Sequence, residues 1–83
     1  MPQNIDITLL NGSLSQNLFF AKDTFLNSNL LGDNGTLLGP GENVGSQLAA
    51  GPDNHGHIQY WYKGGSSQTR DDVSNGDTID MSS

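Results

Sequence analysis

The chain has 83 residues, of which 33% are hydrophobic and 14% are charged, and its formal net charge is −6. Its only cations, Lys22, Lys63 and Arg70, are scattered, so the chain has no basic cluster for nucleic acid or for an anionic membrane surface. It has no cysteine for a disulfide or a thiolate metal site, and its longest apolar runs are too short for a transmembrane segment.

The length predicts one small domain over residues 1–83. A domain of this size buries only about 60% of the surface that its unfolded chain exposes. Eleven glycines raise the entropic cost of folding further. Without disulfides, stability must come from self-association, a bound ion or an unusually good core. We favour self-association in a homo-oligomer over a stable monomer.

Short strands separated by turns are expected along most of the chain, because Gly, Pro, Asn and Ser punctuate it throughout. Alternating apolar and polar residues predict a first strand over Asn4–Leu10, with Ile5, Ile7 and Leu9 on one face. Further strands are predicted at Thr36–Leu38, Val44–Ala50, His57–Lys63 and Asp77–Met81, the last with Ile79 and Met81 facing inward.

Five turns can be placed between these strands. The pairs Asn11-Gly12, Asn34-Gly35 and Asn75-Gly76 are typical of type I′ hairpins, because Asn and Gly both tolerate a positive φ. Proline-containing turns are predicted at Gly39-Pro40-Gly41 and at residues 51–54.

The segment Leu14–Leu31 fits two structures. Its apolar residues Leu14, Leu18, Ala21 and Phe25 have helical spacing. The same segment is rich in Asn, Ser, Thr and Phe, which are weak helix formers, and it also fits a strand interrupted by a bulge or turn at residues 22–24. We favour the strand. The expected fold is then all-β, a small antiparallel β-sandwich or partly open barrel with Asn-Gly hairpins, and the alternative is an α+β fold with one helix at 14–31.

Residues 37–65 carry a resemblance to a known family. They run Leu-Leu-Gly-Pro-Gly, an alternating segment, a Gly/Asn turn, and then Gly56-His57-Ile58-Gln59-Tyr60-Trp61-Tyr62. This order of apolar residues, Pro-Gly, strand and Gly-x-apolar-x-Tyr resembles the aegerolysins, which are small β-sandwich proteins. The resemblance implies an antiparallel sandwich that engages membrane lipids or partner proteins without catalysis. It carries over no functional residue.

The strand His57–Lys63 holds the candidate binding residues. If Ile58, Tyr60 and Tyr62 face the core, Gln59 and Trp61 lie on the opposite, polar face. A large aromatic side chain on such a face marks a contact with another subunit, a sugar ring or a lipid surface, unless a second layer of the same chain covers it. We take Trp61, Gln59, Tyr60 and Tyr62 as the candidate binding residues.

Two polar clusters are candidate metal sites. Asp71–Asp77 could supply oxygens to Ca²⁺, but the EF-hand spacing places Val73 and Ser82 at ligand positions, so we expect a solvated turn. His55 and His57, with Asp53 nearby, could chelate Zn²⁺ or Cu²⁺. No third ligand follows at useful spacing, so we expect turn histidines and no metal.

No motif indicates catalysis. The sequence has no Gly-x-Ser-x-Gly elbow and no phosphate-binding glycine motif, and its carboxylates are concentrated in turns. We therefore expect no enzyme and no cofactor. The function that the sequence favours is a non-catalytic, self-associating structural or binding subunit. The alternative is a lectin-like or lipid-binding module, with carbohydrate or lipid as the partner of an exposed Trp/Tyr surface.

Overall fold

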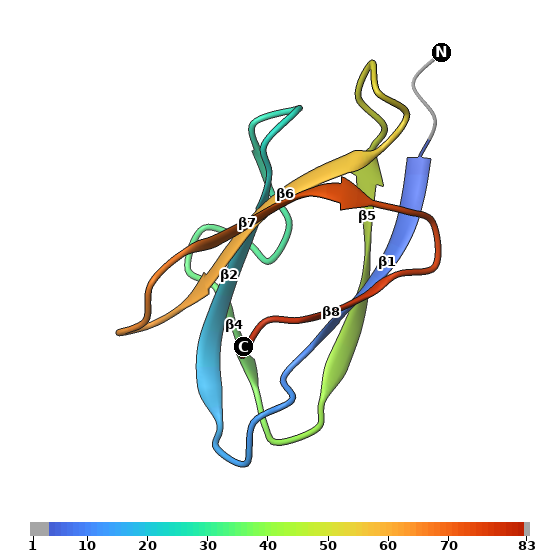
Figure 1. The fold of residues 1–83 in the computed structure, drawn as a ribbon. Helices are drawn as coiled ribbons and strands as arrows, with labels where there is room; N and C mark the ends of the chain where they lie inside the picture. The colour runs from blue at the N-terminus through green and yellow to red at the C-terminus, as the bar shows by residue number, and fades with distance from the viewer. Residues whose placement is uncertain (1–3, 83) are drawn as a thin grey trace.

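The computed structural model describes residues 4–82, which form eight strands and no helix (Figure 1). The strands are β1 (Asn4–Leu10), β2 (Asn17–Asp23), β3 (Ser28–Asn29), β4 (Thr36–Leu38), β5 (Asn43–Ala49), β6 (Gly56–Tyr62), β7 (Gln68–Val73) and β8 (Thr78–Asp80). They form two sheets that pack against each other, so the expected all-β sandwich is confirmed. Residues 4–82 contain no helix long and apolar enough to cross a membrane.

The smaller sheet has the strand order β5-β1-β8. Strands β1 and β5 are antiparallel over their whole length, from Asn4 opposite Ala49 to Leu10 opposite Asn43. Strand β8 runs parallel to β1, with Leu9 opposite Ile79. This sheet is therefore mixed, although only antiparallel pairs were expected. The parallel pair arises because the chain leaves β7 in the other sheet and crosses over before it meets β1 (Figure 1).

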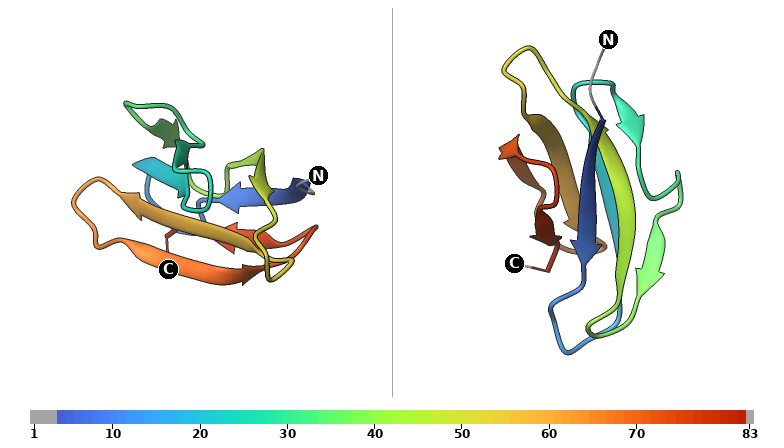
Figure 2. Two further views of the ribbon diagram at one scale, coloured as in Figure 1. Left: turned by 90° about the horizontal axis from the view of Figure 1, so that it is seen from above. Right: turned by 90° about the vertical axis from the view of Figure 1, so that its right-hand side faces the viewer.

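The larger sheet has five strands. Strand β2 lies at its centre, pairing with β6 on one side and with both β3 and β4 on the other, and β7 extends the sheet beyond β6. All of these pairs are antiparallel. Figure 2 shows the two sheets as separate layers. One face of the larger sheet covers the smaller sheet, which leaves its other face to solvent.

The core lies between the two sheets and draws on all the longer strands. Alternate residues of β1, β2 and β6 supply most of it, as the two-residue period of a strand requires. The buried cluster consists of Ile5, Ile7, Leu9, Phe19, Ala21, Leu31, Leu38, Leu48, Ile58, Tyr60, Val73, Ile79 and Met81. Tyr62 packs against this cluster from its rim, with its ring edge-on to Phe19 at a centroid distance of 6.0 Å.

The five strands predicted outside the segment 14–31 all agree with the structure to within one residue at each end, and Asn4–Leu10 and Thr36–Leu38 have the observed bounds. The segment 14–31 forms strands β2 and β3 joined by a turn, so the alternative helix is wrong. Strand β7 was not expected. Its sequence Gln-Thr-Arg-Asp-Asp-Val is polar, and only Val73 is buried, so it lacks the alternation by which a half-buried strand is identified.

The turns differ in detail from expectation. A type I′ turn needs a positive φ at both central residues. The only non-glycine residues with a positive φ among residues 4–82 are Asn27 and Asn54, so none of the three Asn-Gly pairs forms such a turn. The two proline turns are confirmed by hydrogen bonds from Glu42 N to Gly39 O and from Asn54 N to Gly51 O.

A buried asparagine joins the loop after β1 to the loop after β4. Asn11, which follows β1, donates from its side-chain amide to the carbonyls of Ser15, Leu38 and Gly39 at 2.9–3.0 Å. Its backbone N–H donates to Glu42 O, and its carbonyl accepts from Gly41 N. The loop after β1 and the loop after β4 are thereby held side by side at one end of the molecule (Figure 1).

Candidate functional site: the outer face of the five-stranded sheet

The face of the larger sheet that points away from the core is the candidate site. Along β2, the buried residues alternate with Leu18, Phe20 and Lys22, which therefore point outward. Along β6, the outward residues are His57, Gln59 and Trp61. The antiparallel register places Phe20 opposite Trp61 and Lys22 opposite Gln59.

One end of this face is apolar. Phe20 and Trp61 stack with nearly parallel rings, at a centroid distance of 5.4 Å and an interplanar angle of 8°. On the other side of β2, Leu18 lies opposite Leu37 of β4, which is 58% exposed. Leu18 and Phe20 are two residues apart on one strand, so the four side chains are neighbours on one face. We call Leu18, Phe20, Leu37 and Trp61 the apolar stripe.

A glycine in the loop before β4 fits closely beside the stripe. Gly35 has φ of 79°, and a Cβ at this position would come within 2.8 Å of Phe19 O and 2.9 Å of the Phe20 ring. Phe20 is therefore flanked by the Gly35 backbone on one side and by the Trp61 indole on the other. This arrangement orients the aromatic pair and leaves it partly exposed to solvent.

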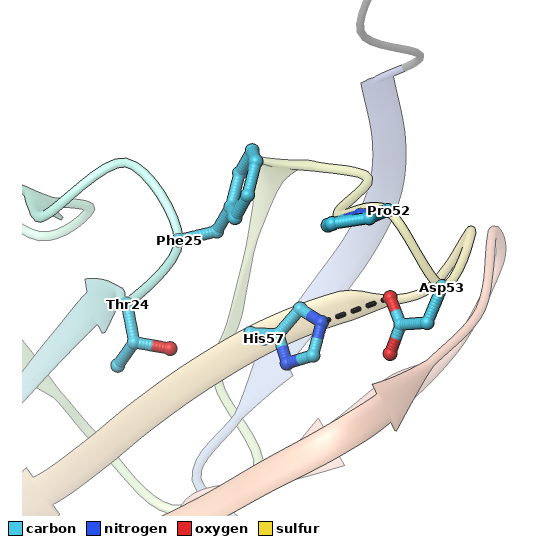
Figure 3. A pocket seen from close by; sticks show the side chains of 5 residues that line it. All are labelled: Thr24, Phe25, Pro52, Asp53 and His57. Atoms are coloured by element: carbon cyan, nitrogen blue, oxygen red, sulfur yellow. Dashed lines mark hydrogen bonds and ion pairs between the residues drawn. The ribbon is translucent and has the colours of Figure 1, made fainter.

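The other end of the face holds a shallow pocket of about 560 Å³. It is lined by Thr24, Phe25, Pro52, Asp53 and His57. Figure 3 shows Phe25 and Pro52 standing on the same side of His57. The turn after β2 and the loop before β6 bring these residues together, and the backbone hydrogen bond from Thr24 N to His57 O joins the two segments.

His57 is bound by carboxylates at both ring nitrogens. Nδ1 lies 2.9 Å from Asp71 Oδ1, and Nε2 lies 3.0 Å from Asp53 Oδ1. A carboxylate only accepts hydrogen bonds, so both contacts are satisfied at once by the doubly protonated ring. The hydrogen bond with Asp71, followed by that with Asp53, raises the pKa of His57 above its ordinary value of 6.5. The hydrogen bond with His57 likewise lowers the pKa of Asp53.

The structure divides the four candidate binding residues between two environments. Gln59 and Trp61 lie on the outer face, as expected. Tyr60 is 6% exposed and belongs to the core, while Tyr62 packs on the rim of the core against Phe19. Within residues 4–82 Trp61 is half-buried, and its indole stacks on Phe20 of the neighbouring strand.

The two candidate metal clusters, Asp71–Asp77 and His55 with His57, form hydrogen bonds within the chain. Ser74–Asp77 form a turn in which Asp77 N donates to Ser74 O, while Asp71 and Asp72 lie in β7. His55 is exposed, and its backbone N–H donates to Asp53. Across residues 4–82, no group of three or more His, Asp or Glu side chains is placed to hold a metal ion.

Sequence reasoning missed most of the apolar stripe. The run Leu18-Phe19-Phe20-Ala21 is apolar on both faces of the strand, so alternation could not show which side chains point outward. The signal that was available is Asp23. Asp23 shares one face of β2 with Phe19 and Ala21. Since Asp23 is buried, that face points to the core, and Leu18 and Phe20 point outward.

Comparison with known proteins identified no relative. No protein-family model, no curated protein and no solved structure matches the chain. The resemblance to aegerolysins stays a prediction.

Proposed function

We propose that this protein is a non-catalytic, self-associating subunit, and that the apolar stripe is a contact between copies. The observation that carries the proposal is the placement of Phe20, Trp61, Leu18 and Leu37 together on the outer face of the larger sheet. Leu37 is exposed and the other three are half-buried, and a contiguous apolar surface of this kind is typical of protein contact sites.

A two-fold contact suits the stripe. In such a contact the same patch is used by both copies, so Leu37 of one copy removes apolar surface of the other from water. The stripe contains no charged side chain, so two copies can approach although each chain carries a net charge of −6. Lys22, at the border of the stripe, adds a cation to this part of a predominantly acidic protein.

The geometry gives the carbohydrate alternative less support than the self-association proposal. Sugar recognition by stacking needs a free aromatic ring face. One face of the Trp61 indole is already occupied by Phe20, and the other three members of the stripe offer no hydrogen-bonding group from their side chains. A lipid surface remains the second candidate, because the exposed Leu37 and the half-buried Trp61 could insert into an uncharged membrane interface.

The stripe is tested by measuring mass against concentration with analytical ultracentrifugation. The variant is Leu37→Lys, and its matched control is Leu14→Lys, because Leu14 is 95% exposed in a loop outside the stripe. Burying one leucine contributes about 1.5–3 kcal/mol. With two copies of Leu37 in a two-fold contact, we expect Leu37→Lys to weaken that contact roughly 100-fold or more. The control should associate like the wild type.

A wild-type protein that stays monomeric at every concentration would overturn the proposal, as would equal association of both variants. The lipid candidate is distinguished by adding vesicles of phosphatidylcholine, which carries no net charge, to the monomeric protein. A blue shift of the fluorescence of Trp61, the chain's only tryptophan, would then favour lipid binding over self-association.

A further inference from the structure

Strand β5 has one edge that pairs with β1 and a second edge that is open for most of its length (Figure 2). The β1 backbone shows which β5 groups point to the open edge. Thr8 N donates to Asp77 O, and Leu10 O accepts from Met81 N, so the even-numbered residues of β1 direct their backbone groups away from β5.

The antiparallel pairing of β5 with β1 then determines which backbone groups of β5 point to the open edge. The residues opposite Asp6, Thr8 and Leu10 form non-hydrogen-bonded pairs with β1, and their own N–H and C=O groups point outward. These residues are Gln47, Gly45 and Asn43. The rule is verified at the end of the strand, where Ala49 N, of the same outward set, donates to Asp23 Oδ2.

The outward groups of Asn43, Gly45 and Gln47 are exposed to solvent. All three residues are exposed, and no atom other than those of its chain neighbours lies within 4 Å of a Cβ built on Gly45. No hydrogen-bond partner for their outward groups is found within residues 4–82. An open row of backbone donors and acceptors is a template for another strand.

The other sheet edges are blocked by features that prevent such pairing. The edge strand β7 carries Arg70, Asp71 and Asp72, and its pairing with β6 is shifted by a bulge. Strands β3, β4 and β8 have only two or three residues. Strand β5, by contrast, has seven residues with no charge, no proline and no bulge. Among the edges of residues 4–82, β5 alone combines length with the absence of any blocking feature.

We propose that the open edge of β5 pairs with β5 of a second copy of this chain, in an antiparallel two-fold contact centred on Gly45. Asn43 then lies opposite Gln47 of the other copy, and Gly45 opposite Gly45, so that six outward N–H groups find carbonyl partners. The strand itself carries no charged side chain, which suits pairing with a second copy of an acidic chain. Two carboxylates beside the strand are held within their own chain, since Glu42 accepts from Gly39 N and Asp6 accepts from Gln47 Nε2.

This contact lies in the other sheet from the apolar stripe, so one chain can use both. Two different two-fold contacts on one chain let each copy bind two others, so the assembly is larger than a dimer; it closes where the two axes intersect at a suitable angle, as in a tetramer, and otherwise continues as an open string. The wild type should therefore reach masses above that of a dimer as its concentration rises. A chain that lacks either contact should stop at a dimer, and a chain that lacks both should remain a monomer.

The edge is tested with Gly45→Pro against Gly45→Ala. Proline removes an N–H that points away from β1, so it costs no hydrogen bond within the sheet, and alanine keeps that N–H in open space. Ultracentrifugation should show Gly45→Pro stopping at a dimer and Gly45→Ala growing like the wild type. The double variant Gly45→Pro/Leu37→Lys should be monomeric.

Amide hydrogen exchange of the unmodified protein provides a second measurement that needs no variant. Raising the protein concentration should slow exchange at Asn43, Gly45 and Gln47 at least about tenfold. Their neighbours Val44 and Ser46 are bonded to β1 at every concentration and should change less. Exchange at the three residues that does not depend on concentration, or growth of Gly45→Pro like that of Gly45→Ala, would overturn edge pairing. Neither result bears on the proposal that the apolar stripe is a contact, because that proposal is tested separately by Leu37→Lys.

Discussion

The carboxylate of Asp23 joins the two sheets to each other through the backbone of Ala49. Asp23 closes β2 in the larger sheet, and its Oδ2 accepts a hydrogen bond of 3.0 Å from Ala49 N at the end of β5 in the smaller sheet. Its Oδ1 accepts from Phe25 N and Leu26 N at 3.0 and 3.1 Å, which shapes the turn that follows. The side chain is 1% exposed, and all its hydrogen bonds are to backbone donors.

Replacing this carboxylate should destabilise the protein. Asp23→Ala leaves three backbone N–H groups without their acceptor, and an unsatisfied buried donor costs about 1–3 kcal/mol. We expect a loss of about 3 kcal/mol in the free energy of unfolding, measured by urea denaturation. Asp23→Asn should lose less, because its amide oxygen can still accept in the turn while its NH₂ group faces Ala49 N–H. Equal stability of the alanine variant and the wild type would contradict this role.

A second prediction concerns the packing of Phe20. Gly35→Ala should reduce the free energy of unfolding and disturb the stacking with Trp61, because the added Cβ meets the Phe20 ring. The matched control is Gly32→Ala. Gly32 has a similar φ of 82° with nothing within 4 Å of its Cβ, so this variant carries only the backbone cost of about 1–2 kcal/mol.

The fluorescence of Trp61 distinguishes the two glycine variants. We expect its spectrum to change in Gly35→Ala and to stay as in the wild type in Gly32→Ala. Identical spectra and identical stabilities would show that the loop before β4 does not position the aromatic pair.

The third prediction concerns pH. Hydrogen bonds to Asp71 and then Asp53 raise the pKa of His57 above 6.5, so its contribution to stability is fully present below pH 6.5 and is lost as the pH rises through the folded-state pKa. The bond with His57 lowers the pKa of Asp53 below 3.8, so its contribution is lost only as the pH falls through that lower value. The Asp53–His57–Asp71 contacts therefore stabilise most between pH 3.8 and pH 6.5.

The urea concentration at the unfolding midpoint of the wild type should decrease as the pH is raised from about 6 to about 8.5. His57→Gln should remove this part of the pH dependence. In an NMR titration, Asp71→Asn should lower the pKa of His57, because the hydrogen bond to Asp71 is the largest cause of its elevation. A pKa of His57 that is the same in the wild type and in Asp71→Asn would show that the contact with Asp71 is not formed in solution.

Local sequence patterns located the half-buried strands well. Ile5, Ile7 and Leu9 alternate with polar residues, and the strand they predict has the observed bounds. The face of His57–Lys63 was also predicted correctly, with Ile58 and Tyr60 in the core and Trp61 outside. Both results follow from the two-residue period of a strand, which is a property of the chain itself.

What sequence alone determined is therefore the strand class, most strand positions and the outward position of Trp61. The tertiary structure decided which strands are neighbours. Only long-range pairing places Leu37 beside Leu18 and Phe20 beside Trp61, sets β8 parallel to β1, and leaves the β5 edge open. Register and strand order depend on how two apolar faces bury each other, and this energy is shared among residues far apart in the chain. Strand β7 has the same explanation, because its polar sequence becomes a strand through pairing with β6 and the burial of Val73.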